Sequence, residues 1–272
     1  MGVSPGDRSL ILAPMDLGLH GKVALVTGST SGLGLASAKA LAAEGAAILL
    51  CGRREELARE EASRLGRAIG VGADLTDPDT PQRLVDATLS EFGRLDILVG
   101  STGGPPPGTA LDTDPDAYPA ALELLVTPMV RLSRLAVPLM RKGGWGRIVF
   151  VTSSAVREPA PMLVLSNSVR MAVHGFAKSL ARQVAGDGIT VNCVLPGRIA
   201  TDRVAQLDQA AAEATGRTIE EVRQSARRSI PSGRYGEPAE FGAAVAFLCS
   251  EQAGYITGAS IPVDGGALSS HW

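Results

Sequence analysis

The sequence predicts one α/β domain with a doubly wound, parallel β-sheet of about seven strands and helices on both faces. Short apolar runs of strand length alternate with helix-length amphipathic segments, which is the order expected of a parallel sheet with crossover helices. The runs are apolar at consecutive residues, as strands buried on both faces are. A length of 272 residues suits a single domain of this class, and no internal repeat indicates a solenoid.

The runs expected to form strands are residues 23–26, 47–50, 69–71, 97–99, 148–151 and 189–192. The expected helices cover residues 33–44, 55–66, 80–92, 116–142, 163–185 and 237–250. Residues 100–108 are rich in Gly and Pro, which predicts an irregular loop. Residues 198–232 form a long polar segment, which we expect to act as a substrate lid. The domain is expected to span residues 17–272, after a flexible N-terminal tail of residues 1–16.

Composition excludes several classes of partner. The chain has 26 basic and 28 acidic residues, a net charge of −2 and no long basic block, which argues against nucleic acid or an anionic membrane as a main partner. Cys51, Cys193 and Cys249 lie far apart in apolar stretches, and neither they nor the three histidines have metal-ligand spacing. We therefore expect buried free thiols and no metal. No run approaches the ~20 apolar residues of a membrane span, so a soluble, cytoplasmic protein is expected.

Residues 27–34 read Thr-Gly-Ser-Thr-Ser-Gly-Leu-Gly and join the first expected strand to the first expected helix. A helix N-terminus attracts phosphate because it offers free backbone N–H groups and a positive dipole end. Here Gly28 permits a tight turn, Gly32 lets the backbone approach a pyrophosphate, and Gly34 allows the helix to pack closely on the strand. The other expected contacts of the motif are Ser29, Thr30, Ser31 and Leu33. The motif predicts a dinucleotide site.

The end of the second expected strand indicates which dinucleotide binds. An NAD enzyme usually places Asp or Glu there to bind the ribose 2′-hydroxyl, whereas this chain has Gly52 followed by Arg53 and Arg54. Two arginines suit a 2′-phosphate. We therefore favour NADP(H) over NAD(H); the alternative is that both arginines are merely solvated.

Further motifs carry a family resemblance in order along the chain. Residues 27–34 are followed by Asp74-Leu75 after the third strand, by Pro-Gly-Arg-Ile-Ala-Thr at 196–201, and by Tyr-Ile-Thr-Gly and Val-Asp-Gly-Gly within 255–266. From about Leu17 to its end, the chain resembles the short-chain dehydrogenases/reductases. The resemblance implies a Rossmann-like fold and an oxidoreductase acting on a small-molecule carbonyl or alcohol. It also implies a homo-oligomer, a tetramer or a dimer, as do the wide apolar faces of helices 116–142 and 163–185.

The resemblance also implies which residues hold the cofactor. Asp74 and Leu75 would contact the adenine, and the Ile199 backbone and Thr201 would hold the nicotinamide amide. The other residues that the resemblance places against the cofactor are Ser101, Gly103, Arg170, Pro196 and Gly197.

The catalytic positions depart from the family pattern. Members use a Tyr as proton donor, a Lys four residues later, a Ser that positions the carbonyl and an Asn that anchors a relay water, because hydride addition builds negative charge on oxygen. The family spacing maps the Ser to Ser153, the Tyr to Ser166 and the Lys to Arg170, and it maps the Asn to Leu125. The candidate catalytic residues are therefore Ser153, Ser166 and Arg170, in a non-standard site.

These changes predict that the usual proton pathway is absent. Ser166 is shorter than Tyr and a far weaker acid, Arg170 keeps its charge but is not deprotonated, and Leu125 cannot hold a water. His174 lies one helical turn beyond Arg170 and is an alternative acid. Other possible proton sources are water, the substrate itself, Tyr118, Tyr235 and Tyr255.

Three functions are compatible with this sequence. The first is an NADP(H)-dependent oxidoreductase with a remodelled site, favoured by the intact nucleotide motifs. The second is a nucleotide-binding pseudo-enzyme or scaffold subunit, favoured by the missing Tyr and Lys. The third is a redox-neutral, dehalogenase-like lyase: halohydrin dehalogenases resemble this family and carry an Arg at the Lys position, but they keep the Tyr and lack the glycine motif.

Overall fold

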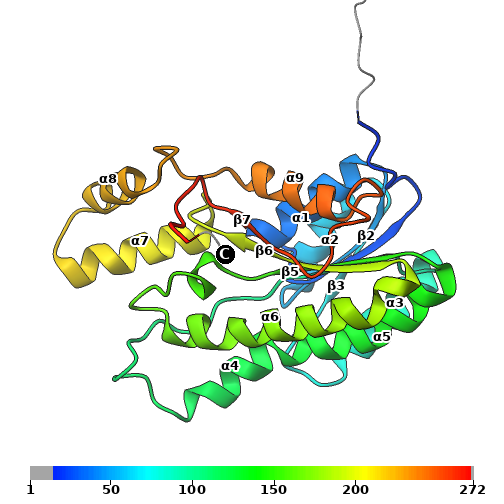
Figure 1. The fold of residues 1–272 in the computed structure, drawn as a ribbon, viewed down its shortest axis with the longest axis horizontal. Helices are drawn as coiled ribbons and strands as arrows, with labels where there is room; N and C mark the ends of the chain where they lie inside the picture. Colours follow the sequence, from blue (N-terminus) through cyan, green and yellow to red (C-terminus); the bar gives the residue numbers. More distant parts are fainter. Residues whose placement is uncertain (1–14, 271–272) are drawn as a thin grey trace, which may run out of the picture.

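A computed structural model describes residues 15–270 of the chain. Its ribbon shows a central sheet between two layers of helices, with a pair of helices projecting beyond one end of the sheet (Figure 1). The predicted N-terminal tail, residues 1–16, falls outside the described residues except for Met15 and Asp16.

The sheet has seven strands in the order β3-β2-β1-β4-β5-β6-β7, and every neighbouring pair is parallel. The strands are β1 (Val23–Val26), β2 (Ala47–Gly52), β3 (Ala68–Gly72), β4 (Ile97–Gly100), β5 (Gly146–Val151), β6 (Ile189–Pro196) and β7 (Ser260–Val263). The predicted fold class is thereby confirmed. Because the order reverses between β1 and β4, the loops after these strands open a crevice at their carboxyl ends.

The helices are α1 (Gly32–Ala43), α2 (Glu55–Ser63), α3 (Thr80–Phe92), α4 (Ala117–Leu125), α5 (Thr127–Gly143), α6 (Val164–Val184), α7 (Asp202–Thr215), α8 (Ile219–Ser229) and α9 (Pro238–Leu248), with short 3-10 turns η1 (Ser154–Val156) and η2 (Ala185–Asp187). One prediction was wrong in detail, because residues 116–142 form α4 and α5 rather than one helix. Pro128, in the first turn of α5, lacks a backbone donor and crowds the preceding turn. The chain therefore starts a new helix there.

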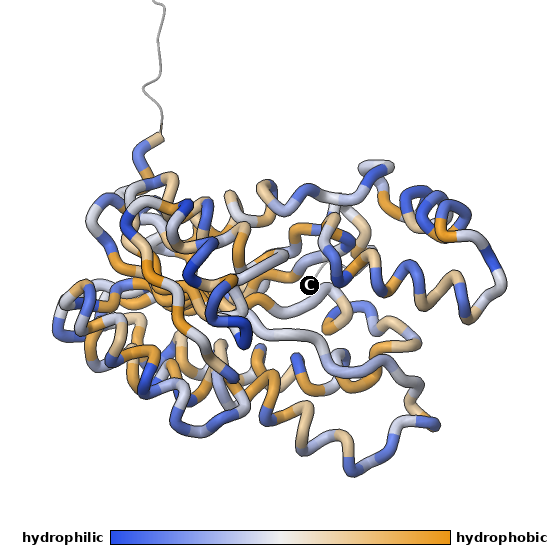
Figure 2. The backbone as a smooth tube through the Cα atoms, turned by 180° about the vertical axis from the view of Figure 1, so that it is seen from behind, coloured by the Kyte–Doolittle hydropathy of each residue, from blue (hydrophilic) through white to orange (hydrophobic). Residues whose placement is uncertain are grey.

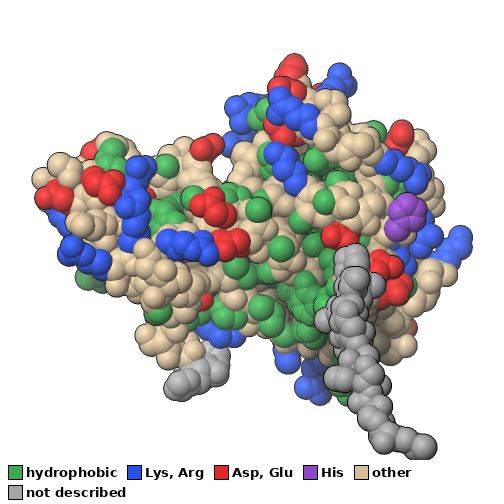
Figure 3. All heavy atoms as spheres, turned by 90° about the horizontal axis from the view of Figure 1, so that it is seen from above, with side chains coloured by type: hydrophobic (Ala, Val, Ile, Leu, Met, Phe, Trp, Pro, Cys, Tyr) green, Lys and Arg blue, Asp and Glu red, His purple; other side chains and the backbone are tan. Residues whose placement is uncertain are grey.

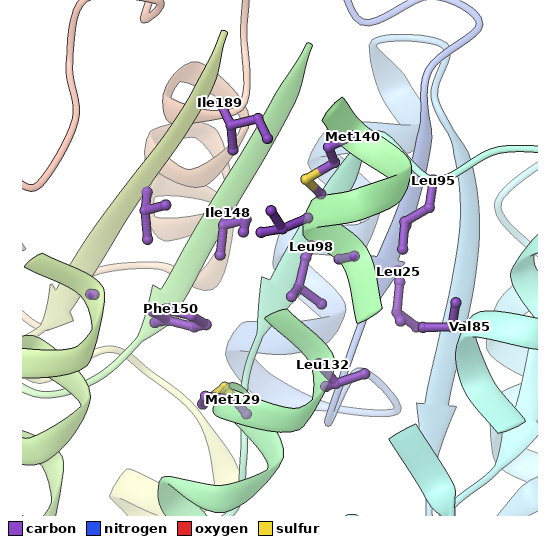
Figure 4. Packing of buried hydrophobic residues seen from close by; sticks show 14 of the residues in the cluster. Leu25, Val85, Leu95, Leu98, Met129, Leu132, Met140, Ile148, Phe150 and Ile189 are labelled. Carbon is purple, nitrogen blue, oxygen red and sulfur yellow. The ribbon is translucent and has the colours of Figure 1, made fainter. Parts of the chain in front are cut away.

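Consecutive residues of each strand face opposite layers, which explains the uninterrupted apolar runs. Leu25 of β1, Leu98 of β4 and Phe150 of β5 belong to one core cluster with residues of α3, α5 and α6 on one face of the sheet, and Figure 4 shows Leu98 between Leu25 and Phe150. Ala24 and Val26 pack with α1 and α9 on the other face. The hydropathy trace accordingly places its most apolar segments in the sheet and the inner helix faces (Figure 2).

Residues 198–232, which the sequence pattern predicted only as a long polar segment, contain two helices. Helices α7 and α8 form an arm (Asp202–Ser229) beyond the carboxyl ends of the strands (Figure 1). The α8 N-terminus is fixed by a capping box, in which Thr218 and Glu221 bond each other's backbone N–H groups. The action of this segment as a lid stays a prediction.

The cysteine prediction agrees with the structure. Cys51, Cys193 and Cys249 are buried and free, and burial raises the pKa of each thiol to about 12. Within residues 15–270, no group of three or more His, Cys, Asp or Glu side chains could hold a metal ion. No helix in that same part of the chain is long and apolar enough to cross a membrane.

Candidate active site

The glycine turn between β1 and α1 is pressed against the loop after β4. Gly28 has φ +54°, and a Cβ there would lie 2.8 Å from the Ser101 carbonyl oxygen. A Cβ on Gly34 would lie 2.2 Å from the Gly28 carbonyl oxygen. Both positions therefore exclude any side chain, Gly28 also because of its left-handed backbone. The turn is held from the β4 side by Thr27, whose hydroxyl donates to Ser101 O at 2.7 Å and accepts from Ser101 N–H at 2.9 Å.

The first turn of α1 is left open for a ligand. Ser31 is the N-cap of α1, and its side chain forms no capping hydrogen bond. Gly32 follows with φ +56°, and the atoms nearest to a Cβ there belong to the Thr201 side chain, at 3.8 Å and beyond. Exposed backbone N–H groups thus face the segment that begins α7, which is the arrangement that binds phosphate at a helix N-terminus.

The motif's hydroxyls do not all point outward. Ser29 is fully buried; its hydroxyl donates to Val26 O at 2.6 Å and accepts from the Cys51 N–H at 3.0 Å. That hydroxyl therefore joins the turn to β2. Leu33 is partly buried against the core shared with α9. Sequence position alone does not distinguish such inward contacts from ligand contacts.

The end of β2 has no room for an acidic side chain. A Cβ on Gly52 would lie 2.6 Å from Thr30 Cγ2 and 2.7 Å from Thr30 Oγ1, so Thr30 occupies the space where an Asp or Glu would start. Arg53 and Arg54 follow on the surface. Two cations, and a glycine where an acid would bind the ribose diol, favour a phosphate ligand at this point.

Asp74 lies close enough to Arg53 for their charges to interact. Hydrogen bonds from the Thr76 N–H and hydroxyl lower the pKa of the Asp74 carboxyl, and the Arg53 charge contributes a smaller part. The Asp74 Oδ1 atom accepts both Thr76 bonds, at 2.9 and 2.8 Å. Leu75 is buried beside it. The expected adenine-side residues therefore lie together.

The proline–glycine segment after β6 is fixed by β7 and by the loop before α9. Gly197 N–H donates to Val263 O at 3.0 Å, and a Cβ on Gly197 would lie 2.6 Å from the Asp264 side chain. Ile199 is buried and pairs through its backbone with Gly236. Thr201 caps α7, accepting the Val204 N–H. Residues 196–201 thus run from the end of β6 in the sheet to the glycine turn.

The candidate catalytic pair Ser166 and Arg170 is buried on α6. Arg170 Nε donates to Ser166 Oγ at 3.2 Å, Nη1 donates to Val151 O at 3.1 Å, and Nη2 donates to Gly103 O at 3.2 Å. Burial, and to a smaller extent the Arg203 charge, lower the pKa of the Arg170 guanidinium to about 10. A cation is therefore held by neutral acceptors at the carboxyl ends of β4 and β5.

Ser153 follows β5 and is only half-buried. Its Oγ accepts the Ala155 N–H at 3.1 Å, which leaves the hydroxyl proton free to donate elsewhere. Leu125, at the end of α4, is 2% exposed and belongs to an apolar cluster with Leu165 and Val169 of α6. That position is therefore part of an apolar contact between α4 and α6.

His174 is a structural residue rather than an acid. Its Nε2 pairs with Thr152 Oγ1 and its Nδ1 with Ser260 Oγ, both at 2.9 Å. Burial, then the charges of Arg157 and Arg170, lower the pKa of the imidazole to about 4. Both ring nitrogens are hydrogen-bonded, and at a pKa of about 4 the ring lacks the acidic second proton of an imidazolium at neutral pH.

The three tyrosines do not lie where a proton donor to the candidate site would be needed. The Tyr235 hydroxyl donates to the Asp208 carboxylate, and Tyr255 is fully exposed. Tyr118 packs at the edge of the apolar cluster between α4 and α6. None of them contacts Ser153, Ser166 or Arg170 through a hydrogen bond in the part of the chain that the structure describes.

Sequence reasoning did not single out Arg203 or Asp208. Arg203 Nη2 donates to Pro105 O at 3.1 Å and so reaches the loop after β4 from α7. Asp208 is 1% exposed and accepts from Arg198 Nη1 at 2.5 Å. Both lie in a polar stretch without a recognisable motif, where only the tertiary contacts distinguish one charged residue from the next.

Comparison with known proteins identifies relatives along nearly the whole chain. The family model described as enoyl-(acyl carrier protein) reductase matches residues 28–267. The chain is 35% identical over 253 residues to a D-beta-hydroxybutyrate dehydrogenase of Cupriavidus necator, covering 91% of this chain and 98% of that protein. It is 35% identical over 251 residues to the 3-oxoacyl-[acyl-carrier-protein] reductase FabG of Vibrio cholerae, covering 92% and 98%.

Solved structures of similar proteins also match nearly the whole chain. L-sorbose reductase from Gluconobacter frateurii, solved with NADPH and L-sorbose, superposes with a TM-score of 0.88 at 35% identity, covering 94% of this chain and all of that one. YwfH, an NADPH-dependent reductase involved in bacilysin biosynthesis, superposes with a TM-score of 0.87 at 27% identity, covering 92% and 99%.

Proposed function

Because the chain belongs to the short-chain dehydrogenase/reductase family, whose members are NAD(P)(H)-dependent oxidoreductases of carbonyl and alcohol substrates, we propose that it is an NADP(H)-dependent member with a non-standard active site. In this site Ser166 and Arg170 stand where the family has Tyr and Lys. The observation that carries the proposal is the uncapped, glycine-containing first turn of α1, together with a buried Ser166–Arg170 pair that is hydrogen-bonded to the carboxyl end of β5 and to the loop after β4.

The residues present fit a dinucleotide. The uncapped N-terminus of α1, at Ser31 and Gly32, would hold the pyrophosphate, and Thr201 lies across from it. The residues that would line the rest of the cofactor are Gly28, Thr30, Gly34, Asp74, Leu75, Ser101, Gly103, Pro196, Gly197 and Ile199. When bound, the nicotinamide supplies or accepts the hydride.

The preference for NADP(H) is supported by the end of β2. Thr30 fills the position in which an acidic side chain on residue 52 would bind the ribose diol. Arg53, with Arg54, is exposed beside it and is free to bind a 2′-phosphate. Two of the similar structures are described as NADPH complexes or NADPH-dependent.

The proposed catalytic roles depend on the hydroxyl protons of Ser153 and Ser166, which their hydrogen bonds within the protein do not use. Ser166 Oγ accepts from Arg170 Nε, and Ser153 Oγ accepts from the Ala155 N–H. Each hydroxyl can therefore donate its own proton toward a carbonyl oxygen between them, while the guanidinium stabilises the charge that develops there. None of these groups is an acid at neutral pH, so water or the substrate supplies the final proton.

A nucleotide-binding subunit without turnover is the second candidate, because the chain has neither the phenol nor the ammonium of its family at these positions. A redox-neutral lyase is less well supported, since such an enzyme has no need for the glycine turn. Fluorescence titration with NADPH and NADH, followed by a turnover screen over ketones, aldehydes and alcohols, separates the candidates. Binding without any turnover would favour the subunit, and no binding of either nucleotide would overturn both.

We also propose that the chain is a homo-oligomer, a dimer or a tetramer. Leu122 on α4 and Met171 on α6 are 40% and 51% exposed, and both helices cover the same side of the sheet as α5 (Figure 1). Exposed apolar side chains on neighbouring helices are typical of a subunit interface. A monomeric mass by light scattering at micromolar concentration would contradict this.

A further inference from the structure

Two arginines from different helices bind the same short loop. Arg170 of α6 donates from Nη2 to Gly103 O at 3.2 Å, and Arg203 of α7 donates from Nη2 to Pro105 O at 3.1 Å. The two acceptors are two residues apart in the segment after β4. Both guanidinium groups therefore contact residues 103–105, one from α6 and one from α7.

No carboxylate of residues 15–270 forms an ion pair with either guanidinium, although other arginines of the chain have such partners. Asp208, further along α7, is engaged by Arg198 at 2.5 Å and Arg223 at 3.6 Å. Asp202 precedes Arg203 but is exposed and forms no ion pair with it. On the face shown in Figure 3, acidic and basic side chains are interspersed over the α7–α8 arm, so unpaired cations are not the general rule on this surface.

This arrangement is unfavourable without an anion. Arg170 is buried and has only neutral hydrogen-bond partners, and the Arg203 charge is close enough to contribute to lowering the Arg170 pKa to about 10. Two like charges beside each other in a partly desolvated crevice gain most from a ligand that carries negative charge. Each guanidinium also keeps N–H donors that no residue of 15–270 accepts.

The position of the pair favours the substrate as the source of that charge. Arg170 bonds Ser166 and Val151, so it lies beside the candidate reacting centre at the end of β5. The dinucleotide phosphates are assigned instead to the first turn of α1, where the neighbouring side chain is Thr201. The cofactor pyrophosphate nevertheless shares the required chemistry, and the experiment must separate the two sources.

We propose that Arg170 and Arg203 together bind a carboxylate of the substrate, so that this protein acts on small oxo acids or hydroxy acids rather than on neutral ketones. The proposal rests on the proposed oxidoreductase function. Guanidinium groups bind carboxylates through paired, charge-assisted hydrogen bonds. Arg203 is exposed at the crevice and provides access, while buried Arg170 provides the charge next to the reacting carbonyl.

The test compares each carboxylic acid with its uncharged methyl ester. Acetoacetate and methyl acetoacetate, and levulinate and methyl levulinate, are titrated by calorimetry into the full chain, with and without saturating NADP⁺. We expect the acids to bind at least about tenfold more tightly than their esters, the factor that a hydrogen bond to a charged group supplies. In the Arg203→Gln variant the acids should lose about tenfold in affinity, and the esters should be unaffected. The exposed Arg228→Gln on α8 is the matched control and should change neither.

Three results would overturn the proposal. Equal binding of acids and esters would show that the pair does not select charge, and so would undetectable binding of every acid. An Arg203→Gln variant that loses NADPH affinity as strongly as acid affinity would assign the pair to the cofactor phosphates. A protein that binds no nucleotide would refute the proposed oxidoreductase, while the titrations without nucleotide would still decide whether the arginines bind carboxylates.

Discussion

Arg170 Nε donates a hydrogen bond to Ser166 Oγ at 3.2 Å, one helical turn away on α6. The bond uses a lone pair of the hydroxyl and leaves its proton free, so the pair presents an O–H donor beside a fixed positive charge. The same guanidinium ties the carboxyl end of β5 to the loop after β4 through Val151 O and Gly103 O. It can polarise a carbonyl but cannot relay a proton.

Restoring the family's acid should therefore increase carbonyl reduction. The double variant Ser166→Tyr with Arg170→Lys introduces a phenol and an ammonium on the face of α6 that now carries the pair. We expect at least about tenfold faster NADPH-dependent reduction of activated ketones, since a positioned general acid typically contributes about 10²–10⁴. The rate should stay below that of a complete site, because Leu125 still fills the space between α4 and α6. Steady-state kinetics on the parent and the variant measure the gain.

Ser168→Tyr, on the exposed side of the same helix, is the matched control and should give no gain. A parent that already reduces such ketones rapidly would show that the chain has another proton source. A folded, NADPH-binding double variant without any gain would show that the pocket itself, and not only the proton donor, has changed.

The 2′-phosphate should be recognised through Arg53. In the Arg53→Ala variant we expect the Kd for NADPH to rise by about tenfold, as for loss of one charge-assisted hydrogen bond, and the Kd for NADH to stay constant. Fluorescence titration of both nucleotides measures the ratio. Arg64→Ala, at the far end of α2 where Arg64 pairs with Glu60 and Glu61, controls for the loss of one surface charge. An unchanged ratio in Arg53→Ala would refute the assignment.

The α7–α8 arm should depend on one buried carboxylate. Asp208 accepts from Arg198 Nη1 at 2.5 Å and from the Tyr235 hydroxyl at 3.0 Å, and Arg223 lies at 3.6 Å. In Asp208→Asn these cations lose their partner, and we expect a loss of about 2 kcal/mol, less than for a fully buried pair because both arginines are partly solvated.

Limited trypsin digestion measures this effect locally, since α8 contains several arginines. We expect cleavage within residues 217–228 to accelerate in Asp208→Asn, because opening of the arm precedes cleavage. The exposed Asp202→Asn, in the first turn of α7, should digest like the parent. Equal digestion of Asp208→Asn and the parent would show that the network does not hold the arm.

The sheet could be predicted because each buried strand is visible in the sequence as a short run of consecutive apolar residues. Residues 23–26 and 97–99 are apolar without interruption, and in the structure successive residues pack into different helical layers. The motif was equally informative for Gly28 and Gly34. A Cβ at either position would lie less than 3 Å from a backbone atom, so only glycine fits. These features are local, so the sequence contains them directly.

Other features depend on contacts between distant segments and were missed or misread. The split between α4 and α5 follows from Pro128, which the apolar pattern of residues 116–142 concealed. Ser29 lies in the glycine motif and was expected to contact the cofactor, yet its hydroxyl bonds the backbone of β1 and β2. The approach of Arg203 to Pro105 joins residues 98 positions apart. Side-chain direction and long-range proximity are set by the fold, not by spacing.

The partly buried His174 should make the protein less stable in mild acid. Burial, then the charges of Arg157 and Arg170, hold the pKa of this imidazole at about 4 in the folded state, whereas in the unfolded chain it is about 6.5. Between these values the unfolded state binds the additional proton, so stability is fully present above about pH 6.5 and decreases as the pH falls toward 4. At pH 5 the expected loss relative to pH 7 is about 2 kcal/mol.

The variant His174→Gln tests this directly, because an amide can keep the contacts with Thr152 and Ser260 and cannot be protonated in this range. Urea unfolding at pH 5 and pH 7 should show a smaller pH-dependent loss of stability in this variant than in the parent by about 2 kcal/mol. His20→Gln, at an exposed position, controls for the removal of an imidazole elsewhere. If the parent and His174→Gln lose the same stability between the two pH values, the ring is not held neutral by its surroundings, and its exclusion as a proton donor would have to be withdrawn.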